Sequence, residues 1–147
     1  MKQAMVLLLG FWLSTVALAN PMRFGHTTSP AAFRIDLPGS WLRSKVAGCY
    51  EDLSGARIQA IISENAERTV ANTYPDWKKR FTGMGYQVKE VDFNGSPGLL
   101  ARGPHTCMGV VLHAGHQINL MINLSGDNAP LEELLEQLVI SFQWLNP

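Results

Sequence analysis

The chain has 147 residues, 46% of them hydrophobic, and its 12 Lys and Arg balance 12 Asp and Glu. This balance leaves no basic footprint for nucleic acid and no polybasic patch for a membrane surface, so both are excluded as expected partners. A chain of this length suits a single domain with one hydrophobic core.

Residues 1–19 are typical of an export signal. Lys2 precedes a short apolar run, and Ala17-Leu18-Ala19 forms a cleavage site with small residues at its two outer positions. The run is too short to cross a bilayer. Because Asn20 and not a cysteine follows the site, we expect a cleaved signal peptide, with no lipid anchor and no stable membrane insertion afterwards. The predicted location is the bacterial periplasm or the secreted fraction, and an uncleaved anchor is the alternative.

Residues 20–32 are rich in Pro, Ser, Thr and Ala, which predicts a loosely held leader before a globular domain over residues 33–147. Within that domain, alternating apolar and polar residues predict short strands at residues 33–37, from Trp41 onwards, and at residues 56–63.

Two cysteines, Cys49 and Cys107, follow the cleavage site. In an oxidising compartment an even count favours pairing. Closing the long loop between them would stabilise the fold by about 4 kcal/mol, so we expect a disulfide. The alternative is a catalytic thiolate with a histidine as its base, although no flanking motif supports it.

A helix is predicted where apolar side chains recur at helical spacing, at Tyr74, Trp77, Phe81 and Met84. It ends at Gly83 or Gly85. A strand over residues 86–93 follows, and Asn94-Gly95 is a two-residue hairpin signal that leads into a strand at residues 99–102.

Two strongly apolar strands, residues 107–113 and 117–125, form the next predicted hairpin. Each has an apolar face, formed by Met108, Val110 and Leu112 in the first strand and by Ile118, Leu120 and Ile122 in the second. Pairing these faces requires a loop with an odd number of residues, so we expect a three-residue tip at residues 114–116. The resulting cross-strand pairs are His113 with Gln117, Leu112 with Ile118, and Gly109 with Met121.

The last helix is predicted to start at Pro130. Its apolar stripe consists of Leu131, Leu134, Leu135, Leu138, Val139 and Phe142. We expect this stripe to dock on the sheet face that holds Val110, Leu112, Leu120 and Ile122.

The pair His113-x-x-His116, with His105 as a conceivable third ligand, has the residue type of a zinc site. The expected register places His113 on a strand and His116 in the turn, where a shared metal would distort the loop. No carboxylate or cysteine nearby in the sequence completes the set. We therefore predict no metal site and no other cofactor.

Catalytic patterns are also missing from the sequence. No G-x-S-x-G motif occurs, and Ser40, the nearest candidate, lies in an expected turn between strands. The carboxylates are scattered over loops, a strand end and a helix face, and no Gly-rich phosphate loop precedes a helix. No catalytic residue is therefore predicted.

The run Phe33-Arg34-Ile35-Asp36-Leu37-Pro38-Gly39-Ser40-Trp41 resembles the opening of the PsbP-like, or Mog-type, superfamily, in which Pro, small residues and Trp follow a short apolar strand. The later elements agree in order over residues 30–143: a helix with Trp77 and Phe81, the turn at residues 94–98, apolar strands and a final helix. The resemblance implies an α+β single domain whose antiparallel sheet is flanked by helices, an α/β/α sandwich.

Members of that superfamily are mainly binding or assembly proteins, among them photosystem-associated lumenal proteins, chaperones of type VI secretion effectors and exported bacterial proteins. With an export signal, the resemblance implies a non-enzymatic periplasmic protein-binding module. The sharper expectation is an immunity protein that neutralises a toxin or effector acting in the periplasm. The alternatives are a small secreted hydrolase or metal-dependent enzyme that uses the histidines, and a carrier of an apolar ligand.

The expected partner is another protein, held by loops and by the rim of the sheet. Three segments are candidates for the contact, residues 50–54, 94–98 and 113–117. The partner-binding side chains predicted from residue type are Tyr50, Arg102, His105, His113 and His116.

Overall fold

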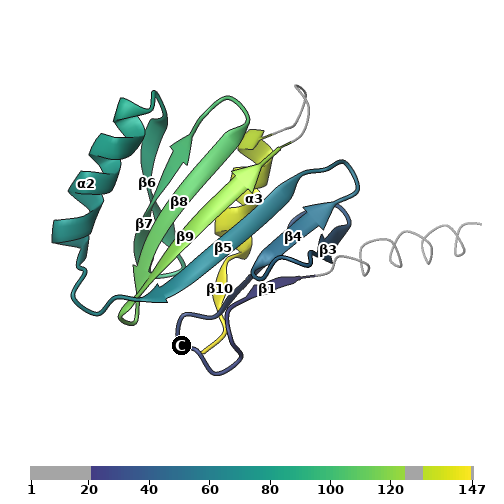
Figure 1. Ribbon diagram of the computed structural model, residues 1–147, viewed down its shortest axis with the longest axis horizontal. Coiled ribbons are helices and arrows are strands. Elements are labelled where there is room, and N and C mark those ends of the chain that lie inside the picture. Colours follow the sequence, from purple (N-terminus) through teal and green to yellow (C-terminus); the bar gives the residue numbers. More distant parts are fainter. Residues whose placement is uncertain (1–20, 125–130, 147) are drawn as a thin grey trace, which may run out of the picture.

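Two antiparallel sheets form the framework of the computed structural model, which describes residues 21–124 and 131–146 (Figure 1). The main sheet has seven strands. In spatial order they are β3 (Trp41–Arg43), β4 (Cys49–Asp52), β5 (Arg57–Glu64), β9 (His116–Asn123), β8 (Thr106–His113), β7 (Ser96–Arg102) and β6 (Gln87–Phe93). Each neighbouring pair runs antiparallel.

A second, three-stranded sheet joins the two ends of the described chain. In this sheet β1 (Met22–Phe24) and β10 (Gln143–Trp144) both pair with β2 (Phe33–Ile35). Met22 and Phe24 are buried, and so are Ala31 and Ala32. The structure differs from the expected loose leader at β1 and at Ala31 and Ala32, because these side chains enter the core. The predicted signal peptide lies outside the described residues.

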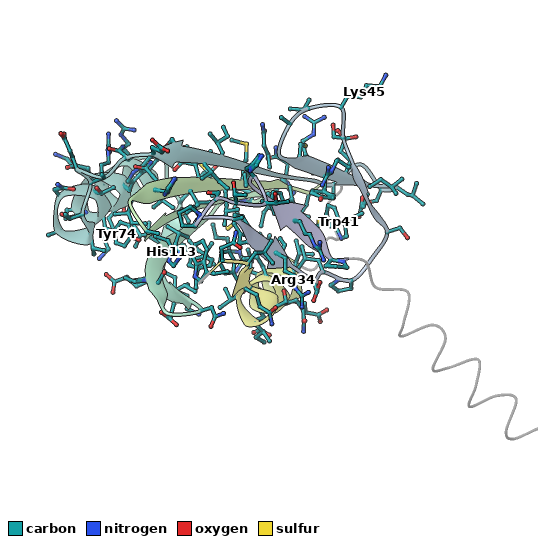
Figure 2. All side chains as sticks on the ribbon, turned by 90° about the horizontal axis from the view of Figure 1, so that it is seen from below. Arg34, Trp41, Lys45, Tyr74 and His113 are labelled. Carbon is teal, nitrogen blue, oxygen red and sulfur yellow. The ribbon has the colours of Figure 1, made fainter. Side chains whose placement is uncertain are left out.

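The two described helices pack against different sets of core residues: α2 (Val70–Gly83) and α3 (Leu131–Ser141). Thr69 begins α2 with a capping box, in which its hydroxyl accepts from the Asn72 N–H and the Asn72 side chain accepts from the Thr69 N–H. Figure 2 shows α3 on one side of the sheets. The expected α+β fold class, with helices flanking an antiparallel sheet, is confirmed. Neither described helix has the length and apolar character needed to cross a membrane.

The hairpin between β8 and β9 differs by one residue from the expected register. Its turn has two residues, Ala114 and Gly115, both with positive φ, as a type I′ turn requires. The observed cross-strand pairs are His113 with His116, Leu112 with Gln117, and Val111 with Ile118. The expected three-residue tip is therefore wrong.

Both faces of β8 are apolar, which explains why parity alone could not fix the register. Val110 and Val111 are each fully buried, although consecutive residues of a strand point to opposite faces. Val110 packs with Tyr74 and Phe81 from α2, whereas Val111 belongs to the larger cluster that includes α3. A one-residue slip consequently leaves apolar side chains on both faces.

This register also changes the docking face of α3. Leu131, Leu135 and Leu138 pack with Leu120 and Ile122, as expected. The other two expected contacts are wrong, because Val110 and Leu112 lie with the α2 cluster. The predicted helix start at Pro130 lies outside the described residues.

The expected disulfide is not formed. Cys49 and Cys107 are free, buried thiols on β4 and β8. The strands β5 and β9 lie between them, which separates the two cysteines by three interstrand spacings, or about 14 Å. A disulfide needs Cα atoms within about 7 Å, so this topology does not allow the bond.

Both thiols are therefore expected to be unreactive in the folded protein and to react fully after unfolding. Burial raises the pKa of the Cys107 thiol to about 12, and Cys49 is 1% exposed. At pH 8, iodoacetamide should modify neither thiol of the native protein, and both in guanidinium without any reductant. Mass spectrometry reads the added mass. If the unfolded protein takes up the reagent only after reduction, Cys49 and Cys107 are joined by a disulfide and the structural assignment is wrong.

Candidate functional site

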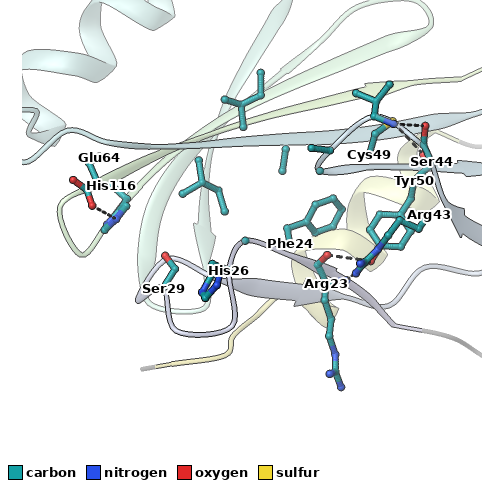
Figure 3. A pocket seen from close by; sticks show the side chains of 17 residues that line it. Arg23, Phe24, His26, Ser29, Arg43, Ser44, Cys49, Tyr50, Glu64 and His116 are labelled. Carbon is teal, nitrogen blue, oxygen red and sulfur yellow. Dashed lines mark hydrogen bonds and ion pairs between the residues drawn. The ribbon is translucent and has the colours of Figure 1, made fainter.

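The candidate site is a cleft of 770 Å³ beside the second half of β5, here called the β5 cleft (Figure 3). Its floor is apolar and includes Phe24, Ala60 and Ile62. The walls come from the loop after β1 and from the connection between β3 and β4, and His116 closes one end. Three segments that are distant in sequence therefore meet at one concave surface.

The cleft exists because β4 is shorter than β5. β5 pairs with β9 along its whole length, from Arg57 to Glu64, but β4 pairs only with its first three residues. The last bond between them runs from the Ala60 N–H to the Gly48 carbonyl, at 2.9 Å. Gly48 has a φ of +69°, a left-handed conformation that suits glycine and turns the chain away from β5.

Tyr50 and Arg43 form one end of the cleft. The buried Tyr50 hydroxyl donates to the Arg23 carbonyl at 3.1 Å and accepts from the Arg23 N–H at 3.2 Å. The Arg43 guanidinium donates to the same hydroxyl at 3.3 Å, and this hydrogen bond raises the pKa of Arg43 above its ordinary value. The Tyr50 hydroxyl thus binds the backbone of β1 and positions the Arg43 guanidinium at the rim of the cleft.

Glu64 and His116 form the opposite end of the cleft, as Figure 3 shows. The His116 Nε2 lies 4.0 Å from a Glu64 carboxylate oxygen, and its Nδ1 donates to the Ala114 carbonyl at 2.8 Å. The Glu64 side chain is 91% exposed, so the carboxylate faces solvent. The cleft therefore has a cation at one end and a carboxylate at the other.

The five side chains expected to bind a partner do not share one surface. Tyr50 and His116 line the cleft, although Tyr50 is buried and acts through its neighbours. Arg102 is the last residue of β7 and lies away from the cleft, where its guanidinium forms an ion pair with Glu132 on α3. His105 lies between β7 and β8, also away from the cleft.

His113 packs within the fold and does not line the cleft. Its ring stacks on Trp144 of β10, with ring centroids 3.7 Å apart and an interplanar angle of 6°. Its Nδ1 lies 2.7 Å from the Ser96 hydroxyl oxygen. His113 thereby joins the main sheet to the small sheet, which is a structural role.

The stability of the protein is expected to fall as the pH drops below about 6.5, with His113 contributing to the loss. Burial, together with nearby His116, lowers the pKa of His113 below its ordinary 6.5. Between these two pKa values the unfolded chain binds more protons than the native protein, so stability is retained above pH 6.5 and lost on acidification. Denaturant unfolding at pH 7.0 and 5.5 measures the change. His113→Asn should show a smaller pH difference than the exposed control His26→Asn, and equal differences would contradict the assignment.

Arg43 and Glu64 were not singled out from the sequence, because the length mismatch between β4 and β5 has no local signature. The three histidines that were weighed as zinc ligands do not come together, because His113 and His116 are cross-strand partners, whereas His105 lies at the far end of β8. Within residues 21–124 and 131–146, no group of three His, Cys, Asp or Glu side chains could hold a metal ion.

Neither a protein-family model nor a curated protein sequence matches the chain. Among solved structures, it is similar to the solution structure of cyanobacterial PsbP (CyanoP) from Synechocystis sp. PCC 6803. The TM-score is 0.58 at 18% sequence identity, over 86% of this chain and 94% of that chain. At this identity the likeness shows the fold and not the activity. The chain therefore has the PsbP-like fold that its opening strand and Trp41 predict.

Proposed function

We propose that this chain is a non-enzymatic binding protein of the periplasm or cell exterior, and that it holds another protein in the β5 cleft. The observation that carries the proposal is the anchored Tyr50–Arg43 pair at the rim of an apolar floor. Tyrosine and arginine are enriched at protein interfaces, and binding energy concentrates where such side chains border a desolvated pocket.

A more specific form of the proposal is an immunity protein whose partner is a toxin or effector that acts in the periplasm. The sequence of residues 1–19 supports export, and a PsbP-like fold is compatible with binding without catalysis. The cleft's opposite charges at Arg43 and Glu64 favour a partner segment of complementary polarity.

The second candidate function is transport of an apolar ligand, for which a pocket lies between α2 and the sheet. It is lined by Trp77, Phe81, Met108 and Met121, and Ile61 at its edge is 58% exposed. Its volume is 230 Å³, which is below the range of about 300–1,000 Å³ that is usual for ligand sites. The larger and more polar β5 cleft is therefore the preferred site.

A comparison of two variants tests the proposed function. Partners captured from envelope extracts are identified, purified, and titrated against Arg43→Ala/Glu64→Ala and against the exposed control Lys79→Ala/Glu133→Ala. The cleft variant should lose roughly 100-fold or more in affinity, as the loss of interface anchors does, while the control stays unchanged. Equal affinities would contradict the proposal, and so would turnover of a cell-wall or lipid substrate by the purified protein alone.

A further inference from the structure

The backbone N–H and C=O groups of β5 point alternately toward β4 and toward β9. This alternation determines which hydrogen-bonding groups face the cleft. The Ala60 N–H donates to Gly48 on the β4 side, and the Asp52 N–H donates to the Ala56 carbonyl. On the other side, the Asn65 N–H donates to the Gly115 carbonyl, beyond β9. In an antiparallel sheet, successive residues point their N–H and C=O groups to opposite sides. Even-numbered residues of β5 therefore face β4, and odd-numbered residues face β9.

Ile62 and Glu64 consequently direct their N–H and C=O groups into the cleft. β4 has already turned away at Gly48, and among the described residues no backbone group pairs with them on this side. The loop after β1 packs against the Ile62 side chain, since a Cβ at Gly25 would lie 2.9 Å from Ile62 Cδ1. The cleft thus contains an open edge of the sheet above an apolar floor.

Resting on the proposed function, we propose that the cleft binds an extended segment of the partner polypeptide as an added strand beside β5, in line with β4. Main-chain hydrogen bonds to Ile62 and Glu64 would supply affinity, and alternate side chains would enter the cleft. Charge complementarity defines the segment: an acidic residue faces Arg43, a basic residue faces Glu64, and apolar residues contact the partly exposed Ile62.

The outer edge of β6, one of the two edge strands of the main sheet, is a competing site for strand addition. That edge carries charged side chains at Lys89, Glu90 and Asp92, and Glu90 forms an ion pair with Lys78 of α2. Charged side chains are a common protection of edge strands. The cleft edge presents Ile62 instead and lies within a concave surface, so it is the favoured docking position.

Amide hydrogen exchange in the free protein tests the open edge first, with matched neighbours as internal controls. The amides of Ile62 and Glu64 should exchange on the order of 100-fold faster than those of Ile61 and Ser63, which face β9. Equal protection of all four amides would show that the edge is closed, and would overturn the proposal.

Selection of displayed peptides tests the added strand. A phage library of random twelve-residue peptides is selected on the immobilised protein, and the enriched peptides are synthesised. The peptides should slow amide exchange at Ile62 and Glu64. N-methylation of any peptide amide that faces β5 should weaken binding by about tenfold. Arg43→Glu should lose peptides with an acidic residue at the facing position and regain binding when that residue is changed to Lys.

The possible outcomes distinguish a failure of the strand-addition proposal from a failure of the proposed function. Peptides that are lost with Arg43→Glu but tolerate N-methylation, and leave the Ile62 amide unprotected, overturn strand addition while the proposed function stands. Peptides that protect only the β6 edge, or a library that yields no binder, overturn both. Concentration-dependent self-association that protects the same two amides would assign the edge to a second copy of this chain instead.

Discussion

Replacing Phe142 with alanine is expected to lower the free energy of unfolding by about 3–5 kcal/mol. Phe142 is 2% exposed and lies directly after α3, where it joins the two sheets. Its ring stacks on Phe33 of β2 at a centroid distance of 4.7 Å, and makes edge contacts with Trp144 at 4.8 Å and Phe93 at 5.2 Å. Truncation removes all three contacts and leaves a cavity in a close-packed region.

Ile140→Ala provides the matched control for this variant. Ile140 lies on α3 only two residues away but is 76% exposed, so its truncation should change stability by less than about 0.5 kcal/mol. Guanidinium unfolding, followed by circular dichroism, measures both. A loss for Phe142→Ala as small as the control's would mean that the aromatic cluster does not join the sheets.

Local signals were sufficient for most of the elements. The helical spacing of Tyr74, Trp77 and Phe81 located α2, although the spacing did not give its start, which Thr69 sets by capping. Asn94-Gly95 predicted the hairpin between β6 and β7, where Phe93 pairs with Ser96. Asn and Gly adopt positive φ readily, and both residues have it here, so the sequence predicted this turn correctly.

The hairpin between β8 and β9 shows where such signals fail. Ala114 has a φ of 50°, a conformation that alanine rarely adopts, and Ala-Gly is not a recognisable type I′ turn. The apolar pattern could not correct the error, because helices cover both faces of β8. The register was therefore set by contacts that are remote in sequence.

The disulfide prediction was wrong, and the prediction of a loose leader missed β1, for a related reason. Both the disulfide and the burial of β1 depend on the order of strands in space. An even cysteine count says nothing about the two strands that lie between Cys49 and Cys107. Likewise, the short run Met22–Phe24 has a place in the core because β2 pairs with it and the rings of Phe33 and Tyr50 pack against Phe24. Neither relation is visible in a local window of sequence.

The candidate site could be predicted only in part. Tyr50 and His116 were selected by residue type, and both line the β5 cleft. The cleft itself arises because β4 stops while β5 continues to Glu64. That difference is created by Gly48, whose role follows from its contact with another strand.

Gly48→Ala is accordingly expected to be one of the most destabilising glycine substitutions, at about 2–5 kcal/mol. The left-handed backbone at a φ of +69° costs a non-glycine residue roughly 1–2 kcal/mol. In addition, the new Cβ would lie 2.5 Å from the Ala60 carbonyl oxygen, which belongs to backbone and cannot move aside like a flexible side chain. Crowding of this kind adds about 1–3 kcal/mol.

Gly115→Ala separates the two causes, because its φ of +72° is nearly the same while the nearest atoms to its Cβ lie at an unstrained 3.9 Å. This control should lose only the conformational part, about 1–2 kcal/mol. Guanidinium unfolding of the two variants at one pH gives the difference directly. A smaller or equal loss for Gly48→Ala would show that β4 can move away from β5 at little cost. In that event the open edge at Ile62 would not be held by the approach of Gly48, and the position at which β4 ends would depend on other contacts along the cleft.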